Sequence, residues 1–497
     1  MSKKIVIPVA IVAVLGVGYT GTSWWFGKQA RTQHQHFVER LNKVAPYLKV
    51  TELESSSGVF SSSRTIKYTV AGSVGCDLAE SMQRVGKDMG PLEFTVKETI
   101  HHGPFTFGGG HTGFARAVVN TELVLSADTR KKLEEVFGKV PPASLRTVVS
   151  MGGDSELTLD VPELTSSLND GSKLQWTGLT ASVSYPADYS SYVTKMSSNG
   201  LTITGASGEQ VQIGKISMDS NSKTEFDVLS VGDASFNIDS MSFKNAALPM
   251  LNTEVSKISY TATSKKNGDF LDMSLKLGVD KVNTMGKSYG PAHYDVSLNH
   301  LHGSTLGKLV QEVNSMSGQC SDQATRQMQL MSALGKHGIA LMQQTPEFIL
   351  DRISLNMPEG EAVIKANAKI NNFAASDVQQ PAGLLQKLEA GLDINFPEAI
   401  AKMLAAQMMA KEGMDPATAE AMLTQQLEGA LAQGLLARNG KQLVTKLSWK
   451  AGKLQINGKE FPLPMLGALM GGAPAAPEGG TPEGAMPEGE ASDAMPQ

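Results

Sequence analysis

The sequence predicts an α+β protein in which one amino-terminal transmembrane helix precedes an extended, twisted, mostly antiparallel β-rich body with helical inserts. The first observation is an uncharged apolar run that begins at Ile5. The second is an alternation of polar and apolar residues that recurs in short segments from Val50 onward, separated by Gly, Asn, Asp and Ser. The third is that a few later stretches lack this alternation and are typical of helices.

The apolar run, residues 5–27, is long enough to cross a bilayer. A helix rises ~1.5 Å per residue, so about 20 residues span the ~30 Å hydrocarbon layer. Basic residues in the short segment 1–4 favour a cytoplasmic amino terminus, and tryptophans prefer the opposite membrane–water interface. The residues predicted to lie at the two interfaces are Lys3, Lys4, Trp24, Trp25, Phe26 and Lys28.

Two other readings of this run are weaker. A cleaved signal peptide has an apolar stretch of only ~7–15 residues followed by a small-x-small site, whereas this run is longer and ends in aromatic residues. A buried helix would have to lie at the extreme terminus and be apolar on every side. We therefore expect an uncleaved anchor, with everything after Lys28 outside the cytoplasm.

Composition limits the function only broadly. At ~100–200 residues per domain, 497 residues allow two or three domains or one long β-rich body. The 44 basic and 49 acidic residues give a net charge of -5, so electrostatics provide no case for nucleic acid binding.

The first elements after the anchor are a helix and then a long series of strands. Residues 28–49 are expected to form a juxtamembrane helix, which Pro46 ends or bends. A β-rich region is expected over 50–300. Within it, Asn267-Gly268 lies between two alternating runs and predicts a two-residue hairpin turn.

The second half mixes helices and strands. A helical insert is expected over 301–350, with a break and a new N-cap near Ser321-Asp322. Residues 351–470 are expected to hold strands, two helices (398–411 and 416–436) and a carboxy-terminal hairpin. Residues 471–497, rich in Gly, Pro and Glu, have too little apolar surface to fold and predict a disordered acidic tail.

The two cysteines, Cys76 and Cys320, are candidates for a disulfide in an oxidising compartment. Their separation along the chain does not decide the matter, because bonding needs Cα atoms within ~7 Å. The alternative is two separate thiols.

The histidines are the best candidates for chemistry, yet the case for each is weak. No zinc-ligand spacing, nucleophile elbow, His-Glu-x-x-His helix or phosphate loop is present. His101 and His102 are adjacent, and adjacent side chains on a strand point to opposite faces. We therefore interpret the segment with His101, His102 and His111 as a strand end before a Gly-Pro turn rather than as a metal site. We predict no catalytic residue, metal or cofactor. The histidines considered are His101, His102, His111, His293, His300 and His302.

The methionines of the two late helices, such as Met403 and Met422, allow two readings. They could line an adaptable apolar groove. Ordinary packing in a core is the more frequent role of such residues, and we favour it.

Several short segments, taken in order, resemble the YdgA-like family of bacterial proteins, a domain family without an assigned biochemical role. They are the anchor with Trp24-Trp25, the segment 57–63, and the residues of 102–105, followed by 294–298 and 454–459. The family-motif residues, whose role is unknown, are Gly58, Val59, Phe60, His102, Gly103, Pro104 and Phe105. The resemblance implies an inner-membrane protein whose bulk faces the periplasm of a Gram-negative bacterium, with a homodimer as one form it allows, and it supplies no catalytic residues.

We therefore favour a non-enzymatic, membrane-anchored envelope protein. A long alternating sheet can expose one apolar face as a β-groove, which suits binding or carrying lipid. The first alternative is a structural or interaction module that docks another envelope protein through its sheet. The second alternative, which we favour least, is a periplasmic hydrolase using His102, His300 or His302.

Overall fold

The computed structural model describes residues 45–84, 92–106, 109–127, 142–167, 171–411 and 415–462, with isolated positions at 20, 22, 23, 25, 26, 38, 39, 41, 42, 130, 131 and 134. Most of the predicted anchor, most of the juxtamembrane helix and the predicted tail lie outside these residues. Within the described part of the chain, no helix combines the length and apolarity needed to cross a membrane.

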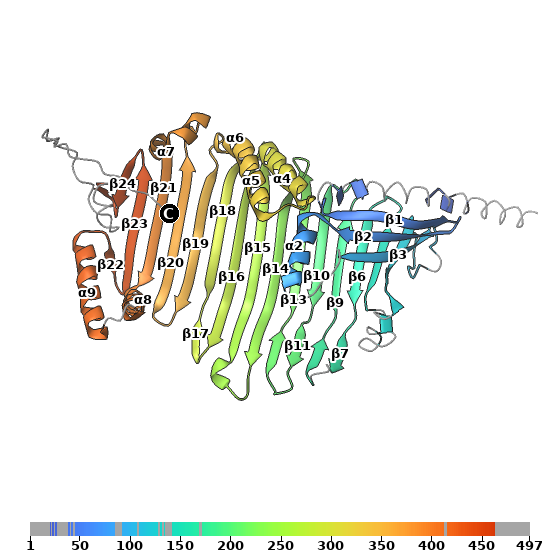
Figure 1. Ribbon diagram of the computed structural model, residues 1–497, viewed down its shortest axis with the longest axis horizontal. Helices are drawn as coiled ribbons and strands as arrows, with labels where there is room; N and C mark the ends of the chain where they lie inside the picture. Colours follow the sequence, from blue (N-terminus) through green and yellow to red (C-terminus); the bar gives the residue numbers. More distant parts are fainter. Residues whose placement is uncertain are drawn as a thin grey trace, which may run out of the picture.

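One antiparallel sheet of 25 strands makes up most of the described chain (Figure 1). The strands of the first half are β1 Leu48–Ser57, β2 Ser61–Val70, β3 Glu93–His102, β4 Ala117–Val124, β5 Ser144–Val149, β6 Ser155–Val161, β7 Leu164–Ser167, β8 Lys173–Trp176, β9 Leu179–Tyr185, β10 Ser191–Ser198, β11 Leu201–Thr204, β12 Gln210–Ile213 and β13 Ile216–Glu225. Those of the second half are β14 Leu229–Lys244, β15 Thr253–Asn267, β16 Phe270–Thr284, β17 Lys287–Tyr289, β18 Ala292–His302, β19 Glu347–Met357, β20 Gly360–Ile370, β21 Leu388–Pro397, β22 Ala437–Asn439, β23 Gln442–Lys450, β24 Lys453–Ile456 and β25 Lys459–Phe461.

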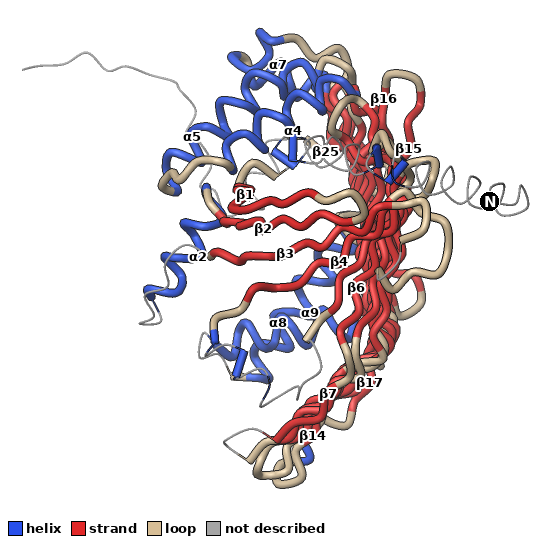
Figure 2. The backbone as a smooth tube through the Cα atoms, turned by 90° about the vertical axis from the view of Figure 1, so that its right-hand side faces the viewer, coloured by secondary structure: helices blue, strands red, loops and turns tan. Residues whose placement is uncertain are grey.

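The helices, except for the single turn η1 in the loop between β14 and β15, lie on one side of this sheet (Figure 2). They are α2 Gly72–Arg84, η1 Pro249–Leu251, α4 Gly303–Ser317, α5 Gln323–Ala333, the π-turn η2 Leu334–Gly338, α6 Ile339–Met342, η3 Ala375–Gln379, α7 Pro381–Lys387, α8 Glu398–Lys411 and α9 Pro416–Ala432. The mostly β architecture with helical inserts agrees with the sequence-based expectation of an antiparallel body.

Most strands pair with a neighbour in sequence, so the sheet is close to a meander. The longest hairpin joins β15 and β16 through the two-residue turn Gly268-Asp269, and Asn267, the last residue of β15, pairs with Phe270. Gly268 has φ +61°, a conformation that glycine adopts without steric cost. The predicted two-residue hairpin turn is therefore present, but it begins one residue later than the expected Asn267-Gly268.

Caps explain where two of the helices begin. Asp322 accepts a hydrogen bond from the backbone N–H of Thr325 and is the N-cap of α5, which confirms the break expected near Ser321-Asp322. Asp415 caps α9 in the same way through Thr418, ahead of a proline at the first helical position. The helix α9 ends at Ala432, earlier than the expected 436, and the chain then turns into the short strand β22.

The sheet bends along a line that crosses several neighbouring strands. Four long strands are interrupted there, at Pro162-Glu163, Thr177-Gly178, Asn199-Gly200 and Gly214-Lys215, and β15 carries Lys257 at φ +50°. Because the interruptions are in register, they act together like a row of β-bulges. Below the line, the strands curve toward the side that carries the helices (Figure 2).

Fully buried side chains are concentrated where helices or neighbouring strands cover the sheet. Near the top of the sheet, Leu306 and Val310 of α4 pack on Leu229, Val231 and Leu271. At the other cluster, Ile100, Ala117 and Val149 pack against Val119. The described helices leave much of the rest of the described sheet uncovered.

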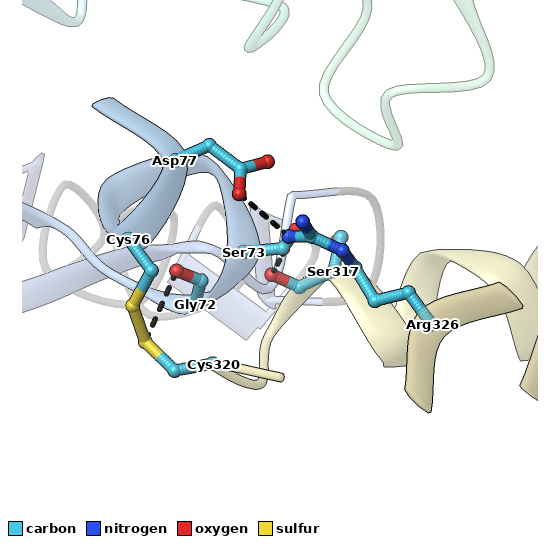
Figure 3. Close-up of a disulfide and its surroundings, with 7 residues drawn as sticks. All are labelled: Gly72, Ser73, Cys76, Asp77, Ser317, Cys320 and Arg326. Atoms are coloured by element: carbon cyan, nitrogen blue, oxygen red, sulfur yellow. Dashed lines mark hydrogen bonds and ion pairs between the residues drawn. A yellow bond between two sulfur atoms is a disulfide. The ribbon is translucent and has the colours of Figure 1, made fainter. Parts of the chain in front are cut away.

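A disulfide joins Cys76 in α2 to Cys320 just after α4, with 6.0 Å between the Cα atoms (Figure 3). Around it, the Asp77 carboxylate lies 2.8 Å from Arg326, and the Ser73 hydroxyl donates to the carbonyl of Ser317. Since α2 connects β2 to β3 and α4 follows β18, the bond ties the first strands to the helix layer across an arc of the sheet.

We predict that the double variant Cys76→Ser, Cys320→Ser unfolds at lower denaturant concentration. The bond closes a loop with a sequence separation of 244 residues, for which chain entropy gives about 5 kcal/mol, although measured disulfides typically contribute about 2–4 kcal/mol. Equilibrium unfolding of the variant, and of the wild type with and without reductant, measures the effect. Equal stability of all three would contradict the prediction.

A second prediction concerns the bend. An added Cβ at Gly200, where φ is +118°, would lie 2.1 Å from the carbonyl oxygen of Ile213. The matched control is Gly208, which has φ +88° and where an added Cβ would meet no heavy atom within 4 Å. We expect Gly200→Ala to lower the free energy of unfolding by about 1–3 kcal/mol more than Gly208→Ala. Losses of the same size would show that the close approach is unimportant.

Candidate functional site

The side of the sheet that carries the helices is mostly apolar along its central rows. Residues that pair directly across antiparallel strands share a face, so each row of pairs can be followed across the sheet. The longest apolar row runs through twelve strands: Leu145, Leu159, Ala181, Met196, Met218, Phe236, Tyr260, Leu277, Tyr294, Ile353, Ile364 and Ile394. At ~4.8 Å between strands, this row is about 50 Å long.

The next row toward the helices is also uncharged. It consists of Leu157, Val183, Thr194, Ser220, Ala234, Ala262, Leu275, Val296, Leu350, Ala366, Leu392 and Leu447. On the far side of the bend, a third row of directly paired residues is also apolar: Leu164, Trp176, Leu201, Ile213, Met241, Val255 and Val282. We call the surface formed by the first two rows the trough.

Contacts with the helices show that the trough faces the helix side. Trp449 lies two residues after Leu447 on β23, so its side chain is on the same face of the sheet. Its Nε1–H donates a hydrogen bond to the carbonyl of Leu385 in α7. Thr445 pairs with Ile394 and donates to the carbonyl of Leu435, just after α9. The helices therefore form one wall of the trough, and the strands that curve below the bend form the other (Figure 2).

The middle of the trough is open to solvent. Leu277, Tyr294 and Ile353 are neighbours in one row and are 41%, 40% and 37% exposed. Beside them lies an open cavity of about 400 Å³, whose lining includes Leu298 and Phe348. An exposed and contiguous apolar surface of this kind marks a binding site more often than a scattered apolar side chain does.

The opposite face of the same strands is polar and charged. The row behind Leu277 contains Lys195, Asp219, Ser235, Thr261, Lys276, Asp295 and Arg352. Arg352 donates two hydrogen bonds to Asp295. The sheet therefore separates a solvated back from an apolar front.

One end of the longest row changes from apolar to polar. Beyond Leu145, the row continues through Thr121 to Glu98 and Arg64, which form an ion pair whose side chains are 12% and 13% exposed. Tyr68 lies nearby on β2. Burial raises the pKa of Tyr68, and the Glu98 carboxylate raises it further.

A cluster of tyrosines lies close to this polar end. Tyr185 stacks on Tyr189 with 5.2 Å between ring centroids, and Tyr192 lies at 6.1 Å. Burial raises the pKa of Tyr185, and a hydrogen bond with Ser155 opposes that change. The trough thus combines a long apolar floor with a polar, aromatic end.

Two segments that carry the family resemblance are brought together at the same end of the sheet. His102 closes β3 and is buried, with Nε2 2.8 Å from the Ser62 hydroxyl and Nδ1 3.0 Å from the carbonyl of Val59. Because a carbonyl only accepts, Nδ1 carries the proton and Nε2 accepts from Ser62. The backbone N–H of His102 also donates to the carbonyl of Phe60.

The remaining motif residues shape the turn after β3. An added Cβ on Gly103 would lie 1.8 Å from the carbonyl oxygen of Ala115, so only glycine fits there. The Gly103–Pro104 peptide bond is cis, and Phe105 packs against Phe114 with 4.7 Å between centroids. These residues form the strand end and turn that the sequence indicated.

The end of the predicted anchor contacts this turn. Ser23 donates a hydrogen bond to the carbonyl of Gly103, and the Arg116 guanidinium lies 5.9 Å from the ring centroid of Phe26. Phe26 is buried, whereas Trp25 is 48% exposed. The other predicted interface residues, Lys3, Lys4, Trp24 and Lys28, lie outside the described part of the chain.

The histidines of the second group, His293, His300 and His302, contact aromatic or hydroxyl-bearing neighbours. His300 stacks on Phe270 at 3.9 Å, and His302 lies edge-on to the same ring with Nδ1 2.8 Å from Thr305. His293 contacts Ser354 on the polar back of the sheet. Among the residues that the structure describes, no group of three or more potential metal ligands is found.

The fold and the trough define a class of protein: a single-layer antiparallel β protein with one apolar, partly walled face. A family model described as "Bacterial protein of unknown function (DUF945)" matches residues 1–464. The chain therefore belongs to this family of bacterial proteins. It is also similar to Protein YdgA of Escherichia coli (strain K12), with 19% identity over 493 residues that cover 93% of this chain and 95% of that protein.

Sequence reasoning found the family-motif residues and expected an apolar β-groove, but it did not identify the residues that form the trough. The strands that form its middle were expected as separate alternating segments, yet which residues share a row depends on register. The helix α2, which carries Cys76, was not expected. Alternation itself was the available signal, because apolar residues occupy every second position in 273–279 and 292–298.

We predict that His102→Ala destabilises the protein by about 2 kcal/mol, because it leaves Val59 and Ser62 without a buried hydrogen-bond partner. His101→Ala is the control, since His101 is adjacent on β3 and points to the other face. Equilibrium unfolding compares the two. A loss at His101 as large as that at His102 would contradict the assigned role.

Proposed function

We propose that the protein is an envelope protein anchored in the bacterial inner membrane by residues 5–27, with its β body in the periplasm, and that it binds the acyl chains of lipids in the trough. The observation that carries the proposal is the solvent-exposed, uncharged row through Leu277, Tyr294 and Ile353. Apolar surface of this extent gains free energy when an apolar ligand removes it from water.

The dimensions of the trough suit an acyl chain. One leaflet accounts for about half of the ~30 Å hydrocarbon core of a bilayer, so a row of about 50 Å is several chain lengths long. An extended chain can lie along it without a deep pocket, which fits the open shape of the cavity at Leu298 and Phe348.

The polar end supports an amphiphile as the ligand. The Arg64–Glu98 ion pair and the hydroxyls of Tyr68 and Thr121 lie where the apolar row ends. A lipid has the same division into an apolar chain and a polar group. A wholly apolar ligand would not require a charged terminus on the floor of its site.

Docking of another envelope protein is the second candidate, and the first strand favours it. Within the described chain, β1 pairs with β2 alone and is mostly exposed, so ten residues of backbone form a sheet edge. A register shift between Glu52 and Glu54 interrupts that edge, and such bulges discourage added strands. The hydrolase alternative gains one contact, because Nε2 of His102 lies 2.8 Å from the Ser62 hydroxyl, but His102 is only 2% exposed, so we do not favour it.

Lipid uptake tests the proposal. Full-length protein, delipidated in detergent, is mixed with dioleoyl phosphatidylethanolamine or palmitic acid, and bound lipid is measured by native mass spectrometry. We expect Leu277→Asp to lower the affinity at least about tenfold, equivalent to about 1.4 kcal/mol, because a carboxylate on the trough floor must be desolvated when an acyl chain covers it.

The control is Lys276→Asp, the adjacent residue of β16, whose side chain lies on the opposite face. It introduces the same group and should bind lipid like the wild type. Wild-type protein that takes up neither lipid, or equal losses in both variants, would argue against lipid binding in the trough.

A further inference from the structure

Two adjacent loops at the lower end of the sheet expose apolar side chains to solvent. Leu248 and Met250 lie in the β14–β15 connection and are 49% and 70% exposed, while Met285 in the β16–β17 turn is 72% exposed. Thr253 pairs with Thr284, so the two loops are neighbours. We call Leu248, Met250, Leu251 and Met285 the apolar tip; it lies at the bottom of Figure 1.

The β14–β15 loop is held in a defined conformation. The side-chain oxygen of Asn245 accepts hydrogen bonds from the backbone N–H groups of Ala247 and Leu248, and that of Asn252 accepts from Asn245. The single turn η1 follows, with the N–H of Leu251 donating to the carbonyl of Leu248. The apolar side chains therefore point outward from a structured loop.

Other connections at the same edge of the sheet are polar. The β11–β12 loop has the sequence Gly-Ala-Ser-Gly-Glu over 205–209, and the β19–β20 turn is Pro358-Glu359. Loops at a solvated edge ordinarily look like these. Compared with these two described connections, the pair of loops around Met250 and Met285 is apolar.

Two uncharged rows lie between the bend and the apolar tip. Met241, Val255 and Val282 belong to the first, in the same strands that carry the two loops. Phe243, Thr253 and Thr284 form the second, and the hydroxyls of Thr253 and Thr284 lie 3.0 Å apart.

We propose that the apolar tip enters the interfacial region of a phospholipid bilayer, which makes this edge of the sheet the place where lipid passes between membrane and trough. The proposal rests on the lipid-binding function proposed above. The tip is a convex group of four side chains, which suits a penetrable surface better than a protein groove. Lys244 and Lys287 flank it, and Glu254 is the acidic neighbour, so the charge next to the tip favours anionic headgroups.

Vesicle flotation tests this assignment. Full-length protein in phosphatidylcholine nanodiscs is mixed with vesicles of phosphatidylethanolamine and phosphatidylglycerol, and the fraction that floats is measured. We expect the double variant Met250→Asp, Met285→Asp to bind vesicles at least about tenfold more weakly than the wild type. The control Ala206→Asp, Ser207→Asp adds the same two charges to the polar β11–β12 loop and should float like the wild type.

A spectroscopic readout tests insertion directly. Tryptophan fluorescence of Met250→Trp should gain a component that brominated phospholipid in the vesicles quenches, whereas Ala206→Trp should gain none. Quenching of both variants alike, or of neither, would overturn the proposal.

Lipid uptake by the same variants separates this inference from the proposed function. The tip variant should still take up dioleoyl phosphatidylethanolamine from detergent, because the trough floor is intact. Wild-type protein that takes up lipid but does not float would overturn the tip alone, and protein that floats without taking up lipid would overturn the trough and leave the tip as a membrane contact. The wild type could also fail to bind vesicles and have the mass of two chains, with the tip substitutions reducing that mass to one chain. This result would identify a second copy of the protein as the partner of the tip and overturn the proposal.

Discussion

The register of one antiparallel ladder is the constraint on which the rest of this structure depends. Every strand sends alternate side chains to opposite faces, so an apolar front and a charged back arise only if successive strands pair in the same phase. The pairing of Phe236, Tyr260, Leu277 and Tyr294 keeps that phase, and on the back of the sheet Lys276 pairs with Asp295. A slip of one residue in any of these strands would place a charge in the trough.

A sheet in a single layer differs from most domains, which bury an apolar face against a second layer. Here the helices cover only parts of the apolar face, and the disulfide between Cys76 and Cys320 connects the first strands to the helix layer. The contacts of His102 with Val59, Phe60 and Ser62 hold the turn at the start of the sheet. These long-range contacts substitute for part of the stabilisation that a second layer would supply.

The same geometry links the two proposals. The bend at Gly200 and Gly214 turns the lower strands toward the helix side, so the front of the sheet becomes a trough with two walls. The apolar tip at Met250 lies at the edge of the lower wall. The Arg64–Glu98 ion pair lies beyond Leu145, at one end of the longest row. An amphiphilic ligand and a membrane surface as its source are consistent with that arrangement of apolar and polar groups.

Local patterns in the sequence determined the strands, the presence of a two-residue turn beside Asn267, the N-cap at Asp322 and the family membership, because each depends on neighbouring residues. The position of Cys76 within α2, its bond to Cys320, the contact between His102 and Ser62, and the alignment of Leu277 with Tyr294 and Ile353 were decided by tertiary structure. Alternation shows that a strand has an apolar side, but it does not say which residue of another strand lies beside it. The register depends on pairing between segments distant in the chain, and the trough forms only when all of these strands pair in the observed registers.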